Sequence, residues 1–147
     1  MGDDPCESAV TILAQDVYAR LTGHAGLATL VGDRIYPEHL PQNPTCPAVT
    51  YFQVGGPRDH SLAGSSGLAV TRWQVDVWAP TYIEAKAVAE EVRLALDSYR
   101  TTTMRVFLDN EVDLPEPTQD TSASLLNVRH VALEFEVWYT ESKPQEA

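Results

Sequence analysis

The sequence predicts an α+β fold: a mainly antiparallel sheet with two helices packed on one face and a long hairpin loop. Two segments repeat apolar residues at steps of three and four, which is typical of helices with one buried face. Residues 71–77 and 131–139 alternate apolar and polar side chains, as in strands with one buried face. The predicted order is helix, short strand, hairpin, helix and two strands. Two helices lying on one face of such a sheet bury the apolar sides of both layers.

The chain of 147 residues and 16.2 kDa has the length of one domain. We therefore expect a single domain over residues 1–147, with its core at about 5–140 and a frayed tail at 141–147. A hydrophobic share of 44% is too high for a disordered chain. Ten basic and 21 acidic residues give a net charge of -11, which argues against binding nucleic acid through its phosphates.

Targeting and redox signals are few. No apolar stretch is long enough to span a membrane, and the acidic N-terminus lacks the features of a secretory signal. We therefore expect a soluble protein made inside the cell, with Cys6 and Cys46 as free thiols.

The first predicted helix begins at Asp4-Pro5 and ends at Gly23, and one further turn follows before Gly32. Its apolar stripe consists of Val10, Leu13, Ala14, Val17 and Leu21. Residues 33–37 then form a short extended segment, and a proline-rich connection leads to a strand over residues 49–54.

Residues 55–67 contain four glycines and three serines and have almost nothing to bury. We expect them to form a long, mobile hairpin tip between the strand at 49–54 and the strand at 71–77. On that second strand Trp73 belongs to the core-facing phase.

The second predicted helix begins at a Thr81–Glu84 capping box and runs to about Arg100. An extended segment at 104–108 then opens into a loop at 109–120 that carries five carboxylates and no basic residue. Such a loop could bind calcium, but its carboxylates lack the spacing of a known calcium loop, so a solvated or interface loop is preferred. The last strand covers 131–139.

The sequence offers no site for chemistry. The histidines at 24, 39, 60 and 130 and the two cysteines lack metal-ligand spacing, and the serines of the tip lack a rigid turn and an oriented base. The close pairs Glu90/Glu91 and Glu134/Glu136 lie on predicted solvent faces. We expect no catalytic residue, no bound metal and no cofactor, and therefore no enzyme.

Trp78 and Trp138 fall on the strand phase that also carries charged residues. Tryptophans placed in this way indicate a surface that becomes buried against another subunit. A helix covering that face would explain them equally well, and both interpretations stay open.

Five short segments occur in the order found in a known family. Residues 30–37 resemble its L-x-G-x-R-I-Y-P segment, residues 47–51 its P-Y-V-x-Y strand and residues 71–79 its R-x-Q-V-D-V-W-A strand. Residues 92–97 and 133–138 are similar to its second helix and last strand. On these motifs the chain resembles the tail completion, or tail terminator, proteins of long-tailed bacteriophages. It departs from them at Ala48, where an aromatic residue is common, and in a longer, more acidic loop at 109–124.

The resemblance implies a structural virion protein that forms a hexameric ring on the head-proximal end of the tail tube. Such a ring ends tube polymerisation and joins the tail to the head connector, without catalysis or a cofactor. The implied partners are other copies of the chain, the tail tube protein and the connector or neck protein. Genomic DNA would pass through the lumen without specific binding. The expected location is the virion, after assembly in the host cytoplasm.

The candidate partner-binding residues come from three places. Arg58, Asp59, His60 and Leu62 lie on the hairpin tip, Trp78 and Trp138 on the charged strand phase, and Asp109, Glu111 and Asp113 in the acidic loop. Two alternatives to the terminator remain open. One is a neck or tail tube subunit of the same kind of particle, and the other is an acidic adaptor that holds a basic partner.

Overall fold

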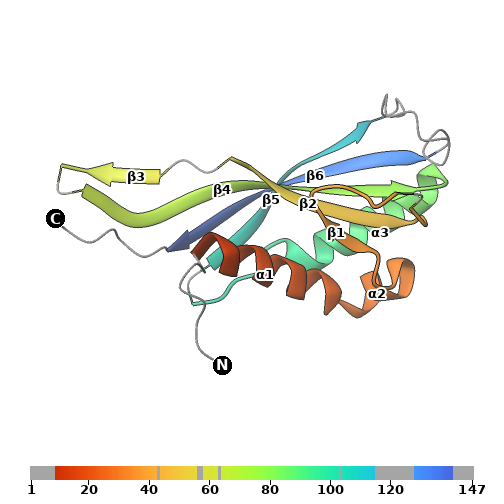
Figure 1. Cartoon of the computed structure of the whole chain (residues 1–147), viewed down its shortest axis with the longest axis horizontal. Helices are drawn as coiled ribbons and strands as arrows, with labels where there is room; N and C mark the ends of the chain where they lie inside the picture. Colours follow the sequence, from red (N-terminus) through yellow and green to blue (C-terminus); the bar gives the residue numbers. More distant parts are fainter. Residues whose placement is uncertain are drawn as a thin grey trace.

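The computed structural model describes residues 9–42, 44–55, 58–62, 64–102, 104–114 and 128–140. In the described residues, three helices and six strands follow one another (Figure 1). They are α1 (Ala9–Thr22), α2 (Ala25–Val31), β1 (Ile35–Pro37), β2 (Ala48–Gly55), β3 (Arg58–Ser61), β4 (Gly64–Ala79), α3 (Tyr82–Leu96), β5 (Met104–Leu114) and β6 (Arg129–Thr140).

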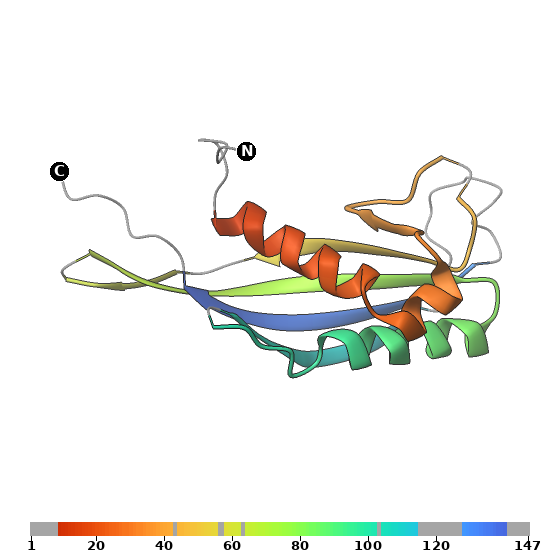
Figure 2. The same ribbon diagram turned by 90° about the horizontal axis from the view of Figure 1, so that it is seen from below.

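The strands form one sheet in the order β1-β2-β4-β6-β5, with β3 paired to β4 beyond the end of β2. Only the short β1–β2 pair is parallel among the described strands. All three helices lie on one side of the sheet, and the β3–β4 hairpin extends away from the body (Figures 1 and 2). The predicted α+β class and the helices on one face are confirmed, with α2 as a third, short helix.

The helix boundaries follow local signals. The backbone N–H of Gly23 donates to Ala19 O at 2.9 Å, which closes α1. Thr81 Oγ1 accepts a hydrogen bond from Glu84 N at 3.2 Å, so the predicted cap of α3 is confirmed. The predicted start of α1 at Asp4-Pro5 lies outside the described residues.

The predicted end of α3 at Arg100 is wrong, because the helix ends at Leu96. Ser98 adopts a left-handed backbone conformation with φ of 63°, and its N–H donates to Val106 O in β5. The chain therefore leaves the helix to pair with the sheet one turn earlier than the apolar spacing indicates.

Two segments predicted to be loops contain strand residues. The hairpin tip at 55–67 includes β3 and the first residues of β4, and the acidic segment includes the second half of β5, up to Leu114. The polar composition of both segments indicated loops. However, the backbone N–H and C=O groups of polar residues can form hydrogen bonds with a neighbouring strand just as those of apolar residues do. Asp109 occupies a bulge of β5, after which β5 continues along β6. Residues 115–127 lie outside the described part.

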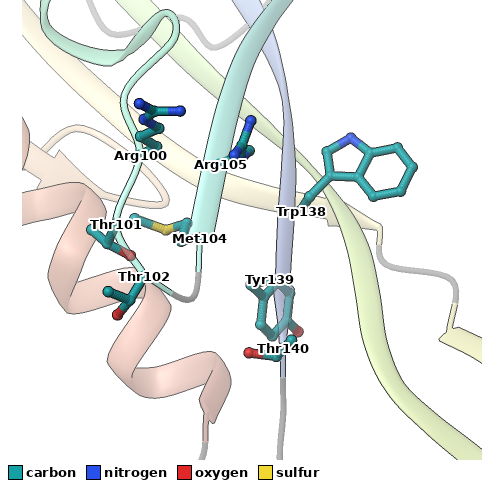
Figure 3. A pocket seen from close by; sticks show the side chains of 8 residues that line it. All are labelled: Arg100, Thr101, Thr102, Met104, Arg105, Trp138, Tyr139 and Thr140. Carbon is teal, nitrogen blue, oxygen red and sulfur yellow. The ribbon is translucent and has the colours of Figure 1, made fainter.

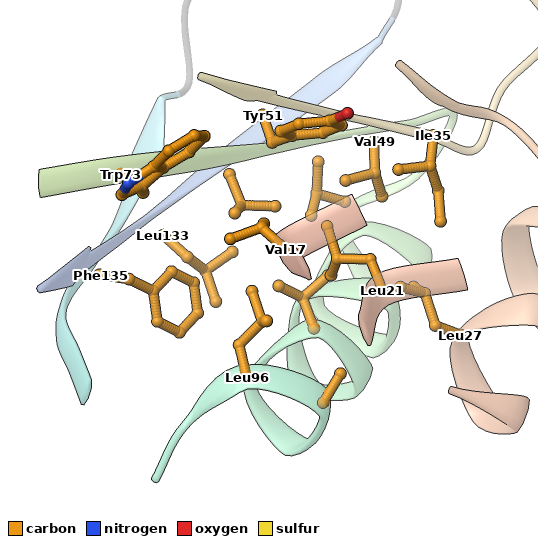
Figure 4. Close-up of a cluster of buried hydrophobic side chains, with 14 of the residues drawn as sticks. Val17, Leu21, Leu27, Ile35, Val49, Tyr51, Trp73, Leu96, Leu133 and Phe135 are labelled. Carbon is orange, nitrogen blue, oxygen red and sulfur yellow. The ribbon is translucent and has the colours of Figure 1, made fainter. Parts of the chain in front are cut away.

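The core lies between the helices and the covered face of the sheet (Figure 4). Trp73 is 4% exposed, as the strand phase predicts, and its Nε1 donates to Thr71 Oγ1 at 3.0 Å. Val17 and Leu21 of α1 and Leu96 of α3 pack into the same cluster as Phe135 of β6. This single layer of apolar contacts holds the helices on one side and leaves the other side of the sheet open.

Candidate interaction surface

The second face of the sheet, here called the helix-free face, consists of the alternate residues of the same strands. Within the described ranges no helix lies over it (Figures 1 and 2). From Val70 on β4 and His130 on β6 onward, its residues on these two strands are Val70, Arg72, Gln74, Asp76, Trp78, His130, Ala132, Glu134, Glu136 and Trp138. For the described part of the chain, a helix that covers Trp78 and Trp138 is therefore not the explanation of these tryptophans.

At one end of this face a polar cluster surrounds Trp78. Its indole stacks on His130 with ring centroids 3.8 Å apart, and its Nε1 donates to Thr50 Oγ1 at 3.2 Å. The carboxylate of Asp76, which is 5% exposed, accepts a hydrogen bond from Gln74 Nε2 at 2.8 Å. Trp78 is thus engaged inside the chain, and its predicted role in an interface stays a prediction.

His130 lies at the centre of this cluster. Its Nε2 is 2.9 Å from Asp76 Oδ1, but it has no hydrogen-bond partner among the described residues. The two side chains are therefore in close contact but are not aligned as a hydrogen bond. The sequence does not reveal this cluster, because Asp76 and His130 are 54 positions apart in sequence and only the β4–β6 register brings them together.

Trp138 lies near the other end of β6. Its side chain is 40% exposed, and it faces Val70 of β4 and Arg105 of β5. It has the exposure that the sequence predicts for a tryptophan available to a partner.

The three carboxylates predicted to bind a partner pair with basic residues of this chain. Asp109 Oδ2 accepts a hydrogen bond from Arg72 Nη1 at 2.7 Å. Lys86 Nζ of α3 lies 2.7 Å from Glu111 Oε2 and 2.8 Å from Asp113 Oδ1. The acidic segment itself contains no basic residue, and in the folded chain β4 and α3 supply the cations that pair with it.

Electrostatics follow from these contacts. Hydrogen bonds from Lys86 and from the Tyr82 hydroxyl, which is 2.7 Å away, hold the pKa of Asp113 below its usual value. The hydrogen bonds to Asp113 and Glu111 raise the pKa of Lys86. The hydrogen bond that the Tyr82 hydroxyl donates to Asp113 likewise raises the pKa of Tyr82. The far half of β5 is thereby tied to the first turns of α3.

The four candidate residues of the hairpin tip lie in a strand and in the turn after it. Arg58, Asp59 and His60 lie in β3, and their side chains are outside the described part. Leu62, at the turn between β3 and β4, is fully exposed at 111%. An exposed leucine at the end of a projecting hairpin is consistent with the predicted contact, which stays untested.

An open hollow of about 670 Å³ lies at the Trp138 end of β5 and β6 (Figure 3). It is lined by Arg100, Thr101, Thr102, Met104, Arg105, Trp138, Tyr139 and Thr140. Neither arginine stands out in the sequence alone. The sequence signal that could have identified them is two arginines on either side of a run of three threonines, in a chain with a large acidic surplus.

In the described residues no three His, Cys, Asp or Glu side chains are grouped to hold a metal ion. Over the same residues, no helix combines the length and the apolar character needed to cross a bilayer.

The layered fold defines a small α+β protein in which one face of the sheet has no helix over it within the described residues. A family model described as tail completion protein gp17 matches residues 15–140. The chain belongs to this family and is a structural protein of a phage-type virion tail. The resemblance stated from the sequence motifs is confirmed.

Other comparisons give the fold. A chain from a structure titled "Virion of native gene transfer agent (GTA) particle" matches with a TM-score of 0.66 and 22% identity, over 86% of this chain and 92% of that chain. At this identity the likeness shows a shared fold. No curated protein matches the chain.

Proposed function

We propose that the chain is a tail terminator: its copies close into a hexameric ring on the head-proximal end of a tail tube and end tube polymerisation. The ring then offers a docking face to the head connector. The observation that carries this proposal is the family match over residues 15–140, which includes every described strand.

Physical features support a ring. A closed ring needs a heterologous contact, in which two different patches of one subunit meet at each interface. The chain exposes large apolar side chains at separate places, including Leu62 on the hairpin, Ile83 on α3 and Trp138 on β6. Aromatic residues are enriched in interface cores, so Trp138 is the strongest candidate among these three.

The charge fits a conduit for DNA. A net charge of -11 repels phosphate groups, so carboxylates along a lumen would let genomic DNA pass without binding it. In this proposal the chain acts as a single domain over residues 1–147, assembles in the host cytoplasm and carries out no catalysis. Arg58, Asp59, His60 and Leu62 of the hairpin contact the tail tube protein or the connector.

The test is to add the purified chain to growing tail tubes and to measure tube lengths by negative-stain electron microscopy. A terminator stops growth at one end, where a ring with a central hole is visible, and the bound species has about six times the 16.2 kDa mass. Fibres formed by the chain alone would instead identify a tube or neck subunit. Tubes that grow unchanged, together with salt-sensitive binding to a basic protein, would identify an adaptor.

A further inference from the structure

Arg100, Arg105 and Trp138 form a row across one end of the helix-free face. Arg100 makes an isolated antiparallel bridge with Arg105, and Arg105 lies opposite Trp138 on β6. Residues opposite each other on antiparallel strands project from the same face, so both guanidinium groups and the indole share one surface. Figure 3 shows the two arginine side chains close together, with Trp138 extending from β6 beside them. We call this group the arginine pocket.

Within the described residues, the positive charge of the arginine pocket has no paired carboxylate. Elsewhere Arg72, Lys86 and Arg93 pair with carboxylates. Among the described residues, the side chains of Arg100 and Arg105 make no ion pair or hydrogen bond. Like charges directly opposite each other destabilise a strand pair, so this arrangement favours the binding of a carboxylate.

The surroundings of the two arginines have the composition of an interface. Trp138 and Phe107 are 40% and 43% exposed, and both lie on the helix-free face next to Arg105. Tryptophan and arginine are the residues most often responsible for binding energy at interfaces. A planar guanidinium also binds a carboxylate through two parallel hydrogen bonds, which sets the direction of approach.

Carboxylates without a partner lie at the opposite edge of the sheet. Asp33 and Glu38 flank β1, are exposed, and have side chains that form no ion pair within the described ranges. Arg34, which lies between them, is engaged with the Pro47 carbonyl at 2.9 Å. β1 and β5 form the two opposite edges of the strand order β1-β2-β4-β6-β5.

We propose that the arginine pocket of one copy binds the acidic corner around Asp33 and Glu38 of a second copy. This pairing joins two different patches of the same protein, so it is a heterologous contact, and it closes into a ring when its rotation divides the circle. The inference rests on the proposed ring-forming function and names the surfaces that form the ring.

The first test is sedimentation velocity of the full chain from about 1 μM to about 1 mM, the range in which weak association is visible. The wild type associates, and the double variant R100E/R105E raises the dissociation constant by about 100-fold or more, because it places acidic groups against acidic ones. Arg129→Glu is the matched control. Arg129 is also exposed, has no ion pair in the described residues, and lies at the other end of β6. Reversing its charge should therefore change the dissociation constant by less than about threefold.

The second test uses complementation. D33K/E38K alone also fails to associate, whereas its equimolar mixture with R100E/R105E restores the wild-type mass, because each interface then joins opposite charges again. Circular dichroism and unchanged melting temperatures show that all variants fold. A wild type that stays monomeric, a double arginine variant that associates normally, or a mixture that restores nothing would each overturn the inference.

The two proposals fail in different ways. If the wild type stops tube growth but associates independently of Arg100 and Arg105, the arginine pocket is not the ring contact and the terminator function stands. If the copies associate through the arginine pocket but tubes keep growing in their presence, the contact stands and the terminator function fails.

Discussion

The two faces of the central sheet are built from the same strands, yet one is apolar and buried and the other is largely polar. On β4, Trp73, Val75 and Val77 point toward the helices and are almost fully buried, while Arg72, Gln74 and Asp76 alternate with them on the helix-free face. The covered face is apolar because burial of apolar area is the main favourable term in folding. The residues of the helix-free face do not have to pack against the helices, so polar and charged side chains can occupy it.

The helix-free face also differs along its length. At the Trp78 end, Asp76 and Thr50 are 5% and 1% exposed although no described helix covers them. At the Trp138 end, the aromatic and basic side chains are exposed. A polar face can thus include a buried cluster at one end and exposed side chains at the other.

The largest contrast is expected between two phenylalanines, one on each face. Phe135→Ala on the covered face should lower the free energy of unfolding by about 3–5 kcal/mol, because Phe135 is 1% exposed and its removal leaves a cavity. Phe107→Ala is the matched control: Phe107 is 43% exposed on the helix-free face, and its loss should cost less than about 1 kcal/mol. Urea unfolding at neutral pH measures both. Equal losses would contradict the division of the sheet into a core face and a contact face.

A smaller effect should distinguish two carboxylates of the helix-free face. Asp76→Ala removes the acceptor of Gln74 Nε2 and the carboxylate beside His130, so Gln74 Nε2 loses its partner inside the cluster. We expect a loss of about 2 kcal/mol in the free energy of unfolding. Glu134→Ala, at the position opposite Gln74 on β6, should cost less than about 0.5 kcal/mol because Glu134 is only half-buried. If both variants unfold at the same urea concentration, the buried cluster adds nothing to stability.

The helix layer can be weakened without changing either face. Thr81→Ala removes the hydrogen bond from Glu84 N to Thr81 Oγ1 at the start of α3, which should destabilise the protein by about 1 kcal/mol. Thr81→Ser keeps the hydroxyl and should retain most of the stability. Thermal unfolding followed by circular dichroism compares the two, and an equal loss for serine and alanine would show that the cap is not the cause.

The covered face was predictable from the sequence because its signal is periodic. Alternation on β4 and β6 and the three- and four-residue steps of α3 identify Trp73, Val75, Phe135 and Val92 as core residues, and all of them are buried. The Thr81 cap was predictable because its partner is three residues away. The end of α3 was not predictable, because apolar Tyr99 continues the helical spacing while pairing with β5 ends the helix.

The helix-free face was less predictable because its contacts join distant positions. Nothing local indicates that Arg72 pairs with Asp109 or that Lys86 pairs with Glu111, since strand register and the bulge at Asp109 decide which side chains meet. The arginine pocket has the same origin, because an isolated bridge places Arg100 opposite Arg105. The composition predicts the net charge of the chain, whereas the strand topology determines where on the surface the charged residues lie.

The smallest effect concerns the ion pairs between α3 and β5, and it depends on pH. The pKa of Asp113 is depressed in the folded chain by hydrogen bonds from Lys86 and Tyr82, so its contribution is present above the unfolded value of 3.8 and is lost as the pH falls through the folded value. The pKa of Lys86 is raised, so its contribution is present below 10.5 and is lost only as the pH rises beyond it. Lys86→Met should therefore lower the urea midpoint by a small, constant amount between about pH 5 and 9, and the difference should shrink below about pH 4. Lys86→Arg keeps the charge and should follow the wild type, whereas a Lys86→Met deficit that persists in acid would mean that lost packing, and not the charge, holds β5 to the helix.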